Sequence, residues 1–191
     1  MAGNEEFTRS TVFRNLASGQ NPECVMVACS DSRVPPEVIL NSGLNALFTI
    51  RAIGEVLGDE GVASIEYGVN HLKTKDGKKP EIIIMGHTGC GAVKAALDVI
   101  GGSEIHEKTL SSVVGSIAEG LRRRDATNDM DRAVTANVDE QAQRLYDRSE
   151  SIRNLVDKGE VKIYSIIYDI STGKLSVPKE ANIKRRNRST V

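Results

Sequence analysis

Two cysteines and one histidine in this 191-residue chain could together bind a metal ion. Cys29 directly follows the apolar run CVMVA at residues 24–28, and His87 and Cys90 lie in the segment Gly-His-Thr-Gly-Cys-Gly at residues 86–91. Two thiolates and one imidazole are a ligand set that suits zinc. Three protein ligands would leave a fourth position open, as in catalytic zinc sites. No fourth Cys or His lies at a spacing typical of a structural site.

A role in the hydrophobic core is the alternative for these cysteines. Cys29 and Cys90 could be small buried residues at strand ends, which is the usual fate of a lone cysteine, and the His-x-x-Cys spacing alone does not decide. Cys24 would lie about 16 Å from Cys29 on an extended strand, too far for a disulfide, so we expect it in the core. The chain has no Cys-x-x-Cys pair, no Cys-x5-Arg phosphate loop and no nucleotide P-loop.

Asp31 and Arg33 follow Cys29 at distances of two and four residues. They could form a surface ion pair that stabilises the fold by about 0–1 kcal/mol. Beside a metal, a carboxylate that accepts the hydrogen bond of a bound water would orient that nucleophile. Asp31 could instead bind zinc itself and block the site, and pairing with Arg33 would hold the carboxylate off the metal.

Short apolar runs alternate with helical periodicity along the chain, which predicts an α/β fold. Buried strands are expected at residues 24–28, 46–50, 81–85 and 161–170, and helices at 62–72, 92–100, 113–121 and 134–156. Ser171-Thr172-Gly173 predicts a hairpin turn before a short returning strand at 175–177. We therefore predict one domain over residues 1–180, with a mostly parallel central sheet, an antiparallel edge strand and helices on both faces, followed by a basic, flexible tail at 181–191.

The predicted sheet decides where the reactive residues lie. In α/β sheets of this kind, sites form at the carboxyl ends of the strands. Cys29 ends the first strand, and His87 and Cys90 follow the third. If these strands are neighbours, the three side chains meet at one edge of the sheet.

Composition excludes several classes of function. Lys and Arg total 25 against 26 Asp and Glu, and aromatic residues are only 4%, so we expect no nucleic-acid partner. No stretch approaches the roughly 18 apolar residues of a membrane span, and the N-terminus does not resemble a signal peptide. Three cysteines do not form a disulfide framework. We expect a cytoplasmic protein without membrane contact.

Two separated motifs resemble those of β-class carbonic anhydrases. They are Gly19-Gln20-Asn21-Pro22 followed by Cys-Ser-Asp-Ser-Arg-Val from Cys29, and the later Gly-His-Thr-Gly-Cys-Gly; the similarity runs from residue 3 to residue 173. The resemblance implies one zinc per chain, bound by Cys29, His87 and Cys90. It also implies the reversible hydration of carbon dioxide to bicarbonate by a metal-bound hydroxide.

The same resemblance implies further roles. Asp31 and Arg33 would be the catalytic dyad, and the family's pocket lies at a dimer interface, so a homodimer or a larger assembly is expected. The residues that match its substrate-binding positions are Gln20, Phe48, Ile53, Gly54, Tyr67 and Gly91.

The chain departs from the family pattern after its second strand. Family members commonly have Arg-Asn-Ala-Gly-Asn where this chain has Arg51-Ala52-Ile53-Gly54-Glu55. Glu55 either reshapes the pocket or is harmlessly solvated. The N-terminus also lacks most of the long helix that family members often wrap around a partner.

Two other functions compete with hydration of carbon dioxide. The first is hydrolysis of carbonyl sulfide or carbon disulfide, which are linear isosteres of carbon dioxide. The second is a zinc-binding but inactive relative that acts through its dimer surface, and Glu55 is its only support.

Overall fold

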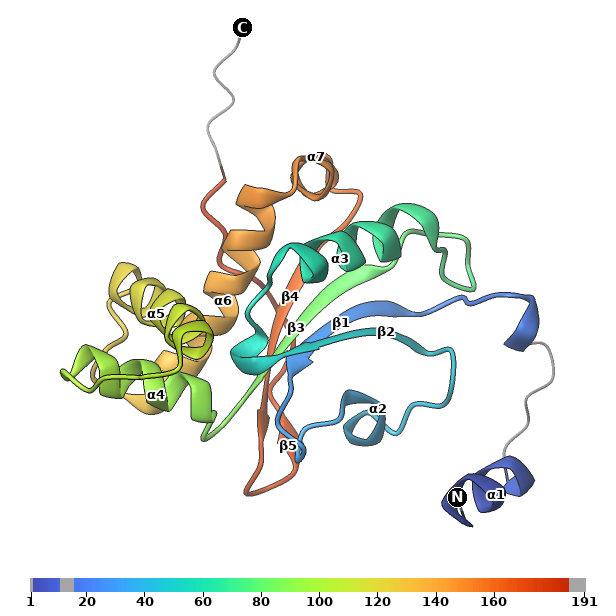
Figure 1. Cartoon of the computed structure of the whole chain (residues 1–191). Coiled ribbons are helices and arrows are strands. Elements are labelled where there is room, and N and C mark those ends of the chain that lie inside the picture. Colours follow the sequence, from blue (N-terminus) through green and yellow to red (C-terminus); the bar gives the residue numbers. More distant parts are fainter. Residues whose placement is uncertain (1, 11–15, 186–191) are drawn as a thin grey trace, which may run out of the picture.

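The fold is built around a six-stranded sheet (Figure 1). The structure is a computed structural model that describes residues 2–10 and 16–185. Four strands run parallel in the order β2-β1-β3-β4, and two short strands pair antiparallel with β4. The prediction of a mostly parallel sheet with an antiparallel edge is confirmed, whereas β6 was not predicted. The strands are β1 (Cys24–Cys29), β2 (Leu47–Ala52), β3 (Glu81–His87), β4 (Ile163–Asp169), β5 (Lys174–Leu175) and β6 (Lys179–Glu180).

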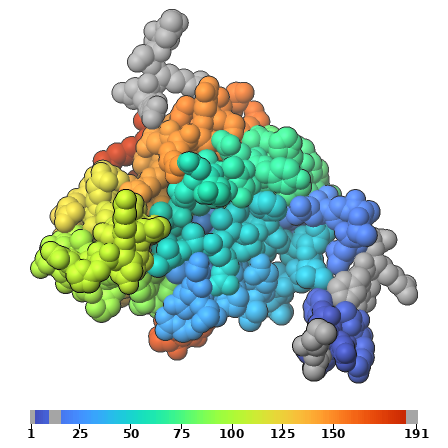
Figure 2. Space-filling model, in the orientation of Figure 1, coloured from blue at the N-terminus to red at the C-terminus, as the bar shows by residue number. Residues whose placement is uncertain are grey.

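Helices surround the sheet on both faces and beyond the carboxyl ends of its strands (Figure 1). Helices α3, α6 and α7 cover one face, the short α2 lies against the other, and α4 and α5 pack together beside α6. Figure 2 shows α1 protruding from the rest of the molecule. The elements are α1 (Ala2–Ser10), α2 (Pro36–Ile39), α3 (Asp59–His71), α4 (Gly91–Ile100), α5 (Lys108–Arg123), α6 (Met130–Arg148), α7 (Glu150–Lys158) and the 3-10 turns η1 (Leu16–Ser18) and η2 (Ile53–Glu55).

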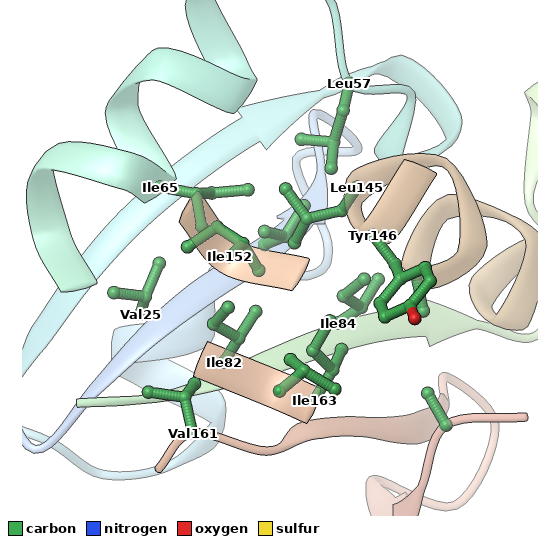
Figure 3. Close-up of a cluster of buried hydrophobic side chains, with 14 of the residues drawn as sticks. Val25, Leu57, Ile65, Ile82, Ile84, Leu145, Tyr146, Ile152, Val161 and Ile163 are labelled. Atoms are coloured by element: carbon green, nitrogen blue, oxygen red, sulfur yellow. The ribbon is translucent and has the colours of Figure 1, made fainter. Parts of the chain in front are cut away.

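Strand β1 is buried along its whole length, which explains its unbroken apolar run. On one face Val25 and Val27 pack with Ile82 and Ile84 of β3 beneath the helices (Figure 3). On the other face Cys24 lies in a second cluster with Met26, Ala28, Met85 and Ile166. Cys24 is therefore a core residue, as predicted. Among the helices of the described residues, none has the length and apolar character needed to cross a membrane.

The helix predicted over residues 134–156 is wrong as a single element, because the chain breaks at Ser149. The backbone of Ser149 is extended (φ −102°, ψ 110°), and its hydroxyl accepts a hydrogen bond from the amide of Ile152 at 3.1 Å. Serine is a favoured N-cap because its side chain satisfies an amide that the helix leaves free. The apolar periodicity continues across the break, which is why the sequence pattern did not show it.

The body of the fold continues past residue 180. Ala181 is buried and Ile183 packs against the main core cluster. The last residues of the predicted tail, 186–191, lie outside the described residues.

Close packing of α6 on β3 allows a stability prediction at Gly86, the residue before His87. A Cβ at this position would lie 2.5 Å from Cγ2 of Val138 and 3.2 Å from Cδ1 of Ile167. Gly86→Ala should therefore lower the free energy of unfolding by about 1–3 kcal/mol, as overpacking does. The measurement is urea unfolding followed by circular dichroism.

Gly115 in α5 supplies the matched control, because a Cβ there meets no atom within 4 Å. Gly115→Ala should be neutral or stabilise by up to about 1 kcal/mol. Equal midpoints for both variants would contradict the packing of α6 against β3.

Candidate metal centre

The register of the sheet brings the three predicted ligands together. Ala28 is opposite Met85 in the parallel pairing of β1 with β3, so Cys29 at the end of β1 lies beside the end of β3. His87 is the last residue of β3, and Gly89 (φ +65°) lets the chain turn back sharply before Cys90 and α4. The prediction that these residues meet at one edge of the sheet is confirmed.

Four side chains, rather than three, converge at this point. Cys29, Glu55, His87 and Cys90 each offer one ligand atom, and these four atoms lie within 4.8 Å of one another. All four residues are buried. Glu55 is only 1% exposed, so the alternative that it is harmlessly solvated is wrong.

The imidazole of His87 is oriented for metal binding. Its Nδ1 lies 3.0 Å from the carbonyl oxygen of Thr88, which can only accept a hydrogen bond, so the proton is assigned to Nδ1. The lone pair of the neutral ring is then on Nε2, which is buried and has no hydrogen-bond partner. Metal-binding histidines usually have this arrangement, with one nitrogen fixed by the protein and the other free for the ion.

The two thiols are electrostatically unequal. A hydrogen bond with Cys90 is the main cause that lowers the pKa of Cys29 to about 4, against the opposing effect of burial. The backbone amide of Gly54 also donates to Sγ of Cys29 at 3.4 Å. The same hydrogen bond, followed by burial, raises the pKa of Cys90. Cys29 is therefore the more easily ionised of the two thiols, and a divalent cation would bind both as thiolates.

Asp31 and Arg33 form a two-pronged ion pair at the rim of this centre. Nε of Arg33 donates to Oδ1 of Asp31 at 2.9 Å, and Nη2 donates to Oδ2 at 2.6 Å. These bonds to Arg33 hold the pKa of Asp31 well below its usual range. Oδ2 of Asp31 lies 4.0 Å from Nε2 of His87. The carboxylate is therefore near the metal-binding group but is held by arginine, outside the set of four.

Arg51 fixes the loop that carries this ion pair, a role that the sequence did not reveal. It lies opposite Ala28 on the neighbouring strand β2. Its guanidinium donates to the carbonyl of Cys29 at 2.9 Å and to the carbonyl of Asp31 at 2.6 Å. An arginine near the end of a mostly apolar strand was the available signal.

Glu55 is held in place from the side of α6. Nδ2 of Asn137 donates to Oε2 of Glu55 at 3.1 Å and to the carbonyl of Gly54 at 2.8 Å. Nε2 of Gln141 in turn donates to Oδ1 of Asn137 at 3.2 Å. Burial, and then the negative charge of Cys29, raise the pKa of Glu55 well above its usual range.

Two buried atoms test whether a metal fits this group. Within residues 2–10 and 16–185, the buried side-chain nitrogen and oxygen atoms that lack a partner are Nε2 of His87 and Oε1 of Glu55. Buried polar atoms are rarely left unpaired, so each needs an explanation. Both atoms belong to the same four-residue group, and one cation would satisfy both. With two thiols as the remaining donors, the group fits zinc.

Comparison with known proteins shows the family. The family model described as carbonic anhydrase matches residues 24–175. The chain belongs to the carbonic anhydrase family. Carbonic anhydrase 2 of Mycobacterium tuberculosis is 34% identical over 161 residues, which cover 83% of this chain and 75% of that protein. The carbonic anhydrase of Mycolicibacterium smegmatis is 30% identical over 165 residues, which cover 85% of this chain and 78% of that protein.

Solved structures give the class. A β-carbonic anhydrase of Aspergillus fumigatus superposes with a TM-score of 0.76 at 27% identity, covering 95% of this chain and 89% of that chain. A β-carbonic anhydrase of Coccomyxa gives a TM-score of 0.73 at 25% identity, covering 94% of this chain and 83% of that chain. This carbonic anhydrase is therefore an enzyme of the β class.

The positions expected to bind substrate separate into two groups. Ile53 and Gly54 lie in η2 beside the metal centre, and Gly91 directly follows Cys90. Gln20 precedes β1 and is thus at the opposite end of that strand from Cys29.

Two aromatic positions also lie away from the metal centre of their own chain. Phe48 pairs with Val25, four residues or about 13 Å before Cys29. The ring of Tyr67 contacts Phe48, with centroids 6.1 Å apart. Neither aromatic residue can therefore complete a pocket at the metal centre of its own chain.

The zinc content of variants should distinguish Cys90, an expected ligand, from Cys24, a core residue. Cys90→Ser removes a sulfur from the four-residue group and should sharply reduce zinc below about one ion per chain. Cys24→Ser alters a buried cysteine at the other end of β1 and should leave zinc content unchanged. The measurement is elemental analysis of purified proteins whose circular dichroism spectra match; equal zinc in all of them would refute this ligand assignment.

Proposed function

We propose that this carbonic anhydrase catalyses the reversible hydration of carbon dioxide to bicarbonate, with one zinc ion held by Cys29, His87 and Cys90. The observation that carries the proposal is the convergence of two thiols and an imidazole lone pair at the ends of β1 and β3. The ion pair of Asp31 and Arg33 lies directly beside them. Curated relatives that share most of the chain are named carbonic anhydrases.

When bound, zinc would supply the usual acidification of water, which makes hydroxide available near neutral pH. Two thiolates neutralise the charge of the ion, so this effect is weaker here than with three neutral histidines. The protein's own contribution is to position the reactants. Asp31 can accept a hydrogen bond from the attacking oxygen and orient it toward the carbon of the substrate.

Arg33 has a distinct positioning role in this scheme. Its guanidinium occupies both oxygens of Asp31, and its backbone amide donates to Oδ1 at 3.0 Å. Arg51 holds the carbonyls on either side of Ser30. Together these contacts would keep the Asp31 carboxylate off a bound metal and within reach of the attacking oxygen.

A second copy of the chain would complete the substrate pocket. Gln20, Phe48 and Tyr67 lie away from the metal centre of their own chain, and Tyr67 is 50% exposed on α3. Ile53, beside the metal centre, is 40% exposed. A homodimer would let these exposed apolar side chains meet, and a β-carbonic anhydrase of Sordaria macrospora, 25% identical with a TM-score of 0.72, is described as tetrameric. A reducing, cytoplasmic setting would keep the two ligand thiols available.

Stopped-flow hydration of carbon dioxide by zinc-loaded protein tests the proposal. The rate should be low in acid and rise with pH, with a midpoint above about 7, because hydroxide forms by deprotonation and two thiolates weaken the acidifying effect of zinc. Asp31 does not cause this rise, because Arg33 lowers its pKa and it is already ionised. A sulfide-release assay with carbonyl sulfide runs in parallel. Sulfide release without hydration, or a zinc-loaded protein inactive in both assays, would refute the proposal.

Replacing Arg33 tests whether the Asp31–Arg33 ion pair takes part in catalysis or is only a surface ion pair. Arg33→Ala frees Asp31 to bind the metal and should lower the hydration rate by orders of magnitude with zinc retained. Asp31→Ala should also lower the rate, because the attacking oxygen loses its acceptor. Arg132→Ala breaks the solvated pair with Asp125 and should leave the rate near the parent value. Parental rates in all three variants would show that the Asp31–Arg33 pair is structural.

A further inference from the structure

Glu55 lies close enough to the three expected ligands to touch the same ion. One of its carboxylate oxygens is within 4.8 Å of the ligand atoms of Cys29, His87 and Cys90. In a tetrahedral zinc site the ligand atoms lie roughly 3.3–3.8 Å apart, given Zn–S near 2.3 Å and Zn–N and Zn–O near 2.0 Å. A carboxylate that reached the ion through a water would lie more than about 5 Å from at least one other ligand atom. The observed spacing fits direct contact.

The surroundings of Glu55 offer its second oxygen no other partner. Oε2 accepts the hydrogen bond of Asn137, whereas Oε1 is buried and unpartnered. Among the ion pairs of the described residues, none involves Glu55. A carboxylate this deeply buried is normally paired or coordinated to a metal.

The backbone at Glu55 is also unusual. Its φ is +55°, directly after Gly54 at +59°, a region that residues with long side chains rarely adopt. The carbonyl of Gly54 is tied to Asn137, which also holds the Glu55 carboxylate. Contacts from α6 thus hold both the turn and the side chain in the position that faces the ligand group.

We propose that Glu55 is a fourth protein ligand of the metal and closes its coordination shell in the resting enzyme. This inference rests on the proposed zinc centre of Cys29, His87 and Cys90. The position that catalysis needs would then be occupied by Glu55, and an exogenous anion or water would enter only by displacing it. Asp31, held by Arg33, is not the residue that closes the site.

Cobalt(II) substitution with a thiocyanate titration tests this assignment without measuring activity. The visible spectrum of Co(II) reports which ligands surround it, and thiocyanate changes the spectrum when it reaches an open position. If Glu55 occupies that position, only the fraction of protein in the open state can bind thiocyanate. The apparent affinity is then the intrinsic affinity multiplied by that open fraction. The full-length parent should therefore respond weakly, and Glu55→Gln should respond at concentrations at least about tenfold lower.

Two further variants make the comparison decisive. Glu60→Gln makes the same chemical change on an exposed residue of α3 and should titrate like the parent. Glu55→Asn shortens the side chain and removes its charge, and it should behave like Glu55→Gln, so the test does not depend on one variant folding. Equal thiocyanate affinity in the parent and in the folded Glu55 variants would overturn the inference.

The outcomes also separate this inference from the proposed function. A parent that binds no cobalt or zinc would overturn both. A parent that binds metal and hydrates carbon dioxide, with thiocyanate affinity equal to that of the Glu55 variants, would overturn only the role of Glu55. A weakly responding parent that catalyses no hydration when zinc-loaded, with Glu55 variants that bind thiocyanate tightly, would support the ligand role and overturn the function.

Discussion

The parallel pairing of β1 with β3 is the constraint on which the candidate site depends. It places Cys29 beside the end of β3, from which His87 and Cys90 extend. A shift of one residue in this register would turn the side chains of β1 to the opposite face of the sheet. The fully buried β1 and the close packing of α6 on Gly86 make such a shift costly. Packing along β1 and β3 therefore determines where Cys29 and His87 lie.

Charge balance is the second requirement. Two thiols, a buried carboxylate and an unpartnered imidazole nitrogen lie together in the interior, and a bound cation would balance their charge. The remaining carboxylate at the rim, Asp31, is balanced separately by Arg33. In the proposed metal centre, this division would let one acidic side chain face the ion while another stays available to the reactants. Glu55 comes from η2 and Asp31 from the loop after β1.

Much of this arrangement could be predicted from the sequence, because it follows from short patterns. Apolar runs identified the long strands, and the position of Cys29 and His87 at strand ends followed from parallel topology. The place of Glu55 could not be predicted in this way. Its burial depends on a left-handed turn and on Asn137, which is 82 positions further along the chain. The break at Ser149 was also hidden, because apolar spacing continues on both sides of it.

Diffraction from crystals of the zinc-loaded protein, recorded on both sides of the zinc absorption edge, tests the central claim most directly. The account predicts one anomalous peak per chain, bounded by Sγ of Cys29, Nε2 of His87 and Sγ of Cys90. A zinc peak elsewhere in the chain, or a disulfide between the two sulfur atoms with no metal between them, would contradict it.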